Sequence, residues 1–127
     1  MHKSRLAGFI IDCRTDDLEA ATRFWSAALG LPAKPGAPVD PLYRTLDTAP
    51  DEVHLEVQQV THPSRVHLDI ETDDLEAEVK RLEKLGARRI AFVRRWWVME
   101  APSGQRFCVI NPQRGALSEH GNAWNGS

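Results

Sequence analysis

The sequence predicts an α+β fold, in which two tandem βαβββ modules form a curved mixed sheet with a concave cleft and with helices on its outer face. Three observations predict this fold. The six residues TDDLEA occur at 15–20 and again at 72–77, 57 positions apart in a chain of 127 residues. Both copies follow a strand-like run, and both expected helices end at a Leu-Gly pair. A fixed offset that several elements share indicates an internal repeat.

Apolar and β-branched runs predict the strands. These runs are residues 8–14, 42–47, 52–60, 66–72, 88–93, 96–100 and 107–111. One helix is expected in each module, directly after its first strand. Asp16 with Glu19, and Asp73 with Glu76, form capping boxes at which these helices are expected to begin. Apolar residues then recur at helical spacing, and a glycine ends each helix.

The chain length suits a single domain. The expected domain spans residues 1–112 and consists of modules over about 8–60 and 66–112, followed by a polar tail over 113–127 that is expected to fray. A net charge of −2 gives no electrostatic reason to expect nucleic acid as a partner. No apolar run is long enough to span a bilayer, so no membrane partner is expected. Only two cysteines occur, far apart, which predicts reduced thiols and a cytoplasmic location.

Strand alternation predicts that each module has one apolar face, covered by its helix, and one polar face. The polar-face candidates are Asp12, His54, Glu56, His67 and Asp69. If the modules lie side by side, these faces line a shared cleft, and clefts with a few convergent polar groups are usual ligand sites. An antiparallel sheet with one solvated face shows the same alternation. Both interpretations stay open at this point.

Trp96 and Trp97 are adjacent on an expected strand, so one faces the helix and the other faces the expected cleft. An indole in a cleft offers a flat stacking surface and one N–H donor. Packing of both rings, one in the core and one at a subunit interface, is the alternative. Both tryptophans are therefore candidate ligand-binding residues.

The strand, the DDLEA helix and the Leu-Gly stop, followed by HLDIETDDLEAEVKRLEKLGA and RWWVMEAPSGQRFCVINP, resemble the glyoxalase/bleomycin-resistance/dioxygenase superfamily. Its members are also called vicinal oxygen chelate proteins, and the chain looks most like the glyoxalase-like domain branch. The resemblance runs from about Gly8 to Pro112. It implies paired βαβββ modules around a U-shaped cleft, and a homodimer.

The resemblance also implies positions for a divalent metal, with one ligand on the first strand and one on the last strand of each module. His67 matches the first-strand ligand of the second module, and Cys108 lies where relatives usually have glutamate. Glu56 falls at the last-strand position of the first module, although His54 and Gln58 lie within the same uncertainty of register. The remaining position is Ile10, which offers no donor atom. The metal candidates are therefore His67, Glu56 and Cys108.

A catalytic metal normally needs three or more protein ligands. Because Ile10 removes one side of the implied cage, the preferred hypothesis is a protein that binds a small polar or cationic molecule in the cleft without the usual metal. The alternative is a lyase, isomerase or dioxygenase that uses Zn, Fe, Mn or Ni to bind a substrate with vicinal oxygens. A third hypothesis is a dimeric interaction domain with a vestigial cleft.

Overall fold

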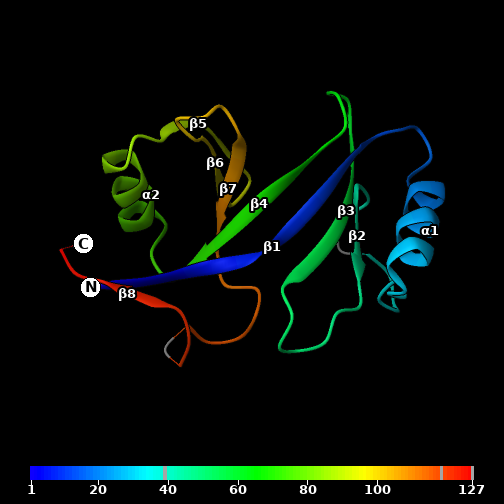
Figure 1. The fold of residues 1–127 in the computed structure, drawn as a ribbon, viewed down its shortest axis with the longest axis horizontal. Helices are drawn as coiled ribbons and strands as arrows, with labels where there is room; N and C mark the ends of the chain where they lie inside the picture. The colour runs from blue at the N-terminus through cyan, green and yellow to red at the C-terminus, as the bar shows by residue number, and fades with distance from the viewer. Residues whose placement is uncertain (39, 118, 127) are drawn as a thin grey trace. The chain divides into compact units, whose positions relative to one another are not determined.

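A computed structural model describes residues 1–38, 40–117 and 119–126. Eight strands and two helices occur in these ranges, and the strands join a mixed sheet (Figure 1). The α+β class is therefore confirmed. The chain divides into two compact units, which we call the N-module (Phe9–Val66) and the C-module (Met1–Gly8 with His67–Ser127).

In the N-module the strand order is β2-β3-β1. It holds the second half of β1 (His2–Arg14), helix α1 (Leu18–Leu29), β2 (Tyr43–Leu46) and β3 (His54–Val60). Strands β2 and β3 are antiparallel. Helix α1 packs on β3, and the core between them consists of Leu18, Leu46 and Val57.

The expected βαβββ pattern of the first module is shortened to βαββ. After α1, the described residues form only an isolated bridge between Ala33 and Leu46, where the pattern requires another strand. Two further backbone hydrogen bonds hold this segment, from Lys34 to Thr45 and from Asp47 to Pro32. Prolines remove backbone donors from this stretch, PAKPGAP, so a longer ladder cannot form.

In the C-module the strand order is β1-β4-β7-β6-β5, with β8 paired to β1. Its elements after β1 are β4 (Arg65–Thr72), α2 (Leu75–Lys84), β5 (Arg88–Val93), β6 (Trp96–Glu100), β7 (Arg106–Ile110) and β8 (Asn122–Trp124). Strands β4 and β7 are parallel, whereas β5, β6 and β7 form an antiparallel meander. Helix α2 packs on that meander over a core of Val79, Leu82, Met99 and Val109.

Both helices begin one residue later than the capping boxes predict. Asp17 caps α1 by accepting from the amide of Ala20, and Asp74 caps α2 by accepting from the amide of Ala77. The second aspartate of TDDLEA therefore does the capping in both copies. The preceding Asp73 accepts a hydrogen bond from the backbone amide of Lys3. Because the 57-residue offset holds for the cap itself, the structure supports a genuine repeat.

Two ordered segments were not predicted. Strand β1 begins at His2 rather than Gly8, and the tail expected to fray contains β8, which pairs antiparallel with His2–Ser4. The indole N–H of Trp124 donates to Ser4 Oγ at 2.8 Å. The guanidinium of Arg81 lies 3.8 Å from the centre of the Trp124 ring. The prediction of fraying is therefore wrong for residues 122–124.

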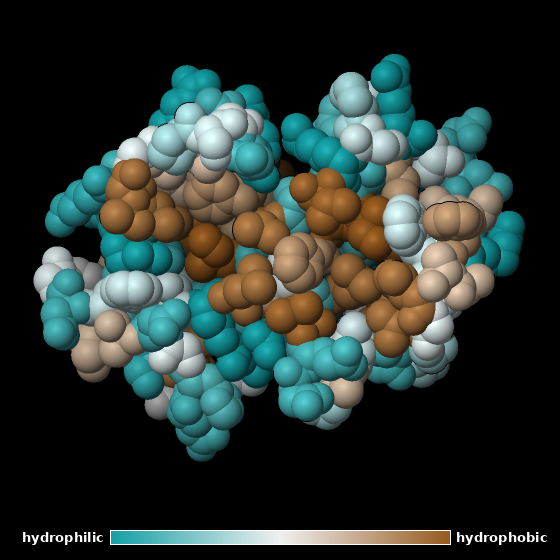
Figure 2. Space-filling view, viewed as in Figure 1, coloured by the Kyte–Doolittle hydropathy of each residue, from teal (hydrophilic) through white to brown (hydrophobic). Residues whose placement is uncertain are grey.

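The helix-facing side of the C-module sheet is only partly covered. Leu68 shares this side with the packed Ile70, yet it is 43% exposed. Figure 2 shows apolar patches exposed among hydrophilic residues. No helix among the described residues is long and apolar enough to cross a membrane.

Candidate functional site

The C-module sheet has a polar face on the side opposite α2, as strand alternation predicts. Ile70, Phe107 and Trp97 pack with the core beneath α2, so their strand neighbours point the other way. The residues on that other face are His67, Asp69 and Glu71 on β4, Arg106, Cys108 and Ile110 on β7, and Trp96, Val98 and Glu100 on β6, with Val98 directly opposite Cys108.

Three of these side chains form a compact cluster, which we call the His-Asp-Cys cluster: His67, Asp69 and Cys108. Asp69 and Cys108 are direct neighbours in the parallel ladder between β4 and β7, and His67 lies two residues before Asp69 on the same face. One imidazole nitrogen, one carboxylate oxygen and the thiol sulfur all lie within 4.8 Å of one another. His67 Nε2 is 3.5 Å from Asp69 Oδ1, and their side chains are only 11% and 12% exposed. Cys108 is half-buried.

Two further carboxylates on this face are engaged by arginines or backbone amides. Glu71, completely buried, accepts from Arg5 Nε at 3.2 Å and from the amides of Gln113 and Arg114. Glu100 accepts from Arg88 and Arg106, which lower the pKa of its carboxyl group. The arginines therefore hold the side chains of Glu71 and Glu100 in place and neutralise their negative charges.

The N-module also has a polar face on the side opposite its helix. Leu55 and Val57 pack with the core beneath α1, whereas His54 and Glu56 point away from it. His54 Nε2 lies 2.6 Å from Glu56 Oε1, and both side chains are about one fifth exposed, at 21% and 19%. Ile10, the residue at the offset position of His67, is buried at 2% exposure and has no atom that binds a metal.

Asp12 is buried in the N-module at 2% exposure. Its Oδ2 lies 3.7 Å from Arg65 Nε and 3.9 Å from His62 Nε2. Strand alternation indicates Asp12, but it indicates neither of these two basic residues. A signal was available, because two basic residues follow closely after β3 in the turn THPSR and a buried carboxylate needs a cationic partner.

The structure distributes the predicted residues between the modules. The C-module holds His67, Asp69, Cys108 and both paired tryptophans, and the N-module holds the others. The proximity of Glu56 to His67 and Cys108 stays a prediction, whereas Asp69 is already beside both.

The two tryptophans have different environments. Trp97 packs with the core beneath α2, with Arg89 over its ring at 4.9 Å and Phe92 against its edge. Trp96 lies on the opposite side of β6, the side of the His-Asp-Cys cluster. Of the pair, only Trp96 is therefore placed to contact a ligand on the polar face.

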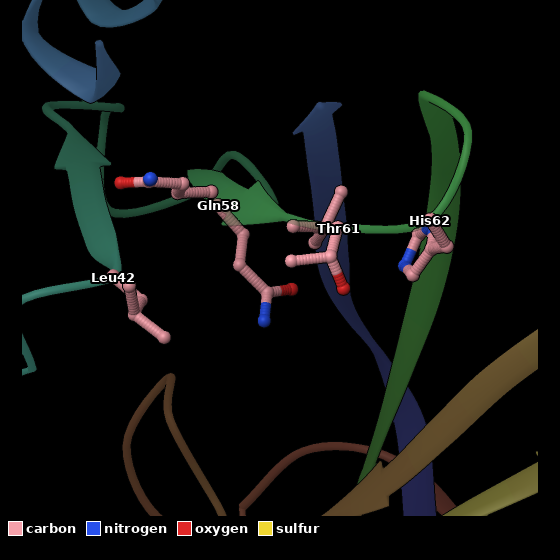
Figure 3. Close-up of a pocket in the computed structure, with 6 residues that line it drawn as sticks. Leu42, Gln58, Thr61 and His62 are labelled. Carbon is pink, nitrogen blue, oxygen red and sulfur yellow. The ribbon is translucent and has the colours of Figure 1, made fainter. Parts of the chain in front are cut away.

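An open depression of about 330 Å³ lies in the N-module (Figure 3). Its lining is Leu42, Gln58, Gln59, Val60, Thr61 and His62. The side chains of Leu42, Gln58 and Thr61 project into the same space. The amide and hydroxyl groups make it suited to hydrogen bonding, and His62 links it to Asp12.

The chain belongs to the glyoxalase-like domain family, whose sequence profile matches residues 8–110. No significant match is found among curated proteins.

Solved structures share the fold at low identity. A hypothetical protein from Bacillus halodurans is 13% identical, with a TM-score of 0.62 over 89% of this chain and 97% of that one. Methylmalonyl-CoA epimerase from Mycobacterium tuberculosis is 16% identical, with a TM-score of 0.59 over 85% and 87%. A glyoxalase/bleomycin resistance protein/dioxygenase superfamily member from Vibrio splendidus is 17% identical, with a TM-score of 0.52 over 84% and 98%. At these identities the similarity establishes the fold alone.

Proposed function

We propose that this glyoxalase-like domain binds a small polar or cationic molecule on its polar sheet faces. The observation that carries this proposal is the His67–Asp69 pair, which is mostly buried on a face that α2 leaves uncovered. Groups held in this way are preorganised for a ligand and lose little side-chain entropy when it binds. Trp96 on the same face adds a surface for stacking.

The charge of these groups favours a cationic or hydroxyl-rich ligand. Glu56 lies against His54 and Asp69 against His67. Carboxylate oxygens accept hydrogen bonds from ammonium, guanidinium and hydroxyl groups, so a ligand that carries such groups suits both pairs.

A thermal-shift screen of metal-free protein against amines, guanidines, polyols and sugars tests the proposal. A ligand that binds only the folded protein raises its melting temperature. We expect at least one cationic or hydroxyl-rich compound to do so, and we expect Asp69→Asn to remove the shift. Asp51→Asn, at an exposed loop position, is the matched control and should keep it. The proposal would be contradicted if no compound raised the melting temperature. It would also be contradicted if Asp69→Asn and Asp51→Asn reduced the ligand-induced shift equally.

A metal-dependent lyase, isomerase or dioxygenase is the second candidate function, and the His-Asp-Cys cluster favours it. Imidazole, carboxylate and thiolate are all zinc ligands, so the donors present fit that metal. When bound, such an ion polarises a ligand oxygen as a Lewis acid. His67, Asp69 and Cys108 would hold the ion, and Trp96 would position the ligand. Fold neighbours include methylmalonyl-CoA epimerases, one of them solved in complex with methylmalonyl-CoA, but identities near 16% assign no substrate here.

We also propose that the chain forms a homodimer in the cytoplasm. Exposed apolar residues such as Leu68 and Phe92 favour self-association, and two half-buried cysteines that form no disulfide suit a reducing compartment. Light scattering after size exclusion should give twice the mass of the chain. The mass of a single chain would contradict the dimer.

A further inference from the structure

The His-Asp-Cys cluster lies wholly within the C-module. Asp69 and Cys108 are paired across β4 and β7, and His67 follows the same face of β4. The register of two hydrogen-bonded strands therefore sets the spacing of the donors, and no loop has to order before they meet.

The donor set favours zinc over the harder metals. Zinc takes nitrogen, sulfur and oxygen donors at about 2.0–2.3 Å in a tetrahedral arrangement, which places neighbouring donors roughly 3.5 Å apart. The donors here lie within 4.8 Å of one another, which is close to that spacing. A thiolate is a soft ligand that magnesium, calcium and manganese do not prefer. A thiolate and a carboxylate also neutralise a divalent charge.

The surroundings of the cluster strengthen the attraction for a cation. The side chains of His67 and Asp69 are nearly nine-tenths buried, so water screens the negative charge of an ionised Asp69 carboxylate poorly. Glu71 and Glu100 are held by arginines, so these two carboxylates on the same face are already neutralised by cations of the protein itself.

We propose that the C-module alone binds zinc through His67, Asp69 and Cys108, with the fourth position open to water or a small oxygen ligand. This set differs from the one that the family resemblance implies, because Asp69 of the same module takes the place of Glu56 of the N-module. As the bond to sulfur forms, the Cys108 thiol releases its proton to solvent, and the imidazole binds in its neutral form. The proposal deepens the second candidate function and rests on it for any catalytic role.

Metal titration of the full chain, purified without a histidine tag and stripped with a chelator, tests the site. Competition with a chromophoric zinc chelator should show one zinc per chain. Cobalt(II) should give a thiolate-to-metal charge-transfer band. Cys108→Ser, Asp69→Asn and His67→Gln should each weaken zinc binding by about a hundredfold or more, because removing a ligand costs at least as much as removing its outer-sphere support.

Two matched controls separate this site from its alternatives. Cys13→Ser should keep wild-type affinity, because burial raises the pKa of the Cys13 thiol and disfavours its thiolate. Glu56→Gln should also keep wild-type zinc affinity. If Glu56 of the N-module were a ligand as well, this substitution would weaken zinc binding. Circular dichroism establishes that each variant is folded, and the cobalt band identifies a thiolate ligand without any substitution.

Equal zinc affinity of wild type and Cys108→Ser, or wild-type protein without the cobalt thiolate band, would overturn the proposal. Weakened binding in Glu56→Gln would overturn the single-module ligand set. No organic ligand takes part in this titration, so its failure is distinct from a failure of the small-molecule screen.

Discussion

Two adjacent tryptophans show how strand alternation assigns different roles to identical residues. Trp97 faces α2 and packs with Met99 and Val109, whereas Trp96 lies on the side of β6 that carries the His-Asp-Cys cluster. Their neighbouring positions and shared chemistry offer a matched pair for mutation, in which one substitution reports on the core and the other on the polar face.

Trp97→Ala should lower the free energy of unfolding by about 3 kcal/mol, because it removes a large apolar side chain from a packed cluster and leaves a cavity. Trp96→Ala should cost less than about 1 kcal/mol, the usual range for a residue outside the core. Urea unfolding of both variants measures the difference. Ligand binding should be reduced mainly in Trp96→Ala. The reverse order of stabilities would contradict the assignment of faces.

Helix α2 is anchored at the element scale by a buried ion pair. Glu78 is fully buried. Its carboxylate accepts from Arg81 Nε and Nη2, each at 2.8 Å, and lies 2.8 Å from His2 Nε2. Burial opposes ionisation of the carboxyl group, but hydrogen bonds from Arg81, His2 and Ser4 outweigh it, so the pKa of Glu78 is lowered. Through these bonds α2 is joined to β1, and Arg81 stacks on Trp124 of β8.

The lowered pKa of Glu78 sets the sign of a pH dependence. Stabilisation from ionised Glu78 is fully present above the unfolded value of about 4.3, and it is lost as the pH falls through the folded value. Glu78→Gln should therefore cost about 3 kcal/mol at pH 7, because it leaves Arg81 without its buried partner. The free energies of unfolding of Glu78→Gln and wild type should become more similar below about pH 4, as Glu78 of the wild type becomes protonated.

Urea unfolding at pH 7 and pH 3.5 measures this effect. Glu76→Gln is the matched control on the same helix. Glu76 pairs with Arg89 but is 53% exposed, so its loss should cost less than about 1 kcal/mol. A difference between Glu78→Gln and wild type that is independent of pH would contradict the role of the ionised carboxylate.

At the scale of the whole molecule, the sequence predicts strands that are marked by a local pattern. It does not predict strands that are ordered by pairing with distant parts of the chain. The expected strand over 96–100 matches β6 and that over 88–93 matches β5, because alternation and turn residues are local signals. The first half of β1 and all of β8 escaped prediction. Their sequences are polar, and they are ordered by pairing with each other across the length of the chain.

The candidate site follows the same rule. Strand alternation alone predicts that His67 and Asp69 lie on the same face of their strand. Their closeness to Cys108 required the parallel pairing of β4 with β7, which are separated in sequence by a helix and two strands. Alternation within single strands does not specify which strands pair. The resemblance implies Glu56 as a ligand, which stays a prediction, and the structure puts Asp69 beside the thiol.

Backbone amide NMR during zinc titration tests the central claim, that the polar face of the C-module is the functional surface. We expect the largest shifts at residues 67–71 and 106–110, where β4 and β7 carry the donors. Residues 54–58 of β3 should shift little. Shifts centred on His54 and Glu56, or no saturable shifts near Cys108, would contradict the account.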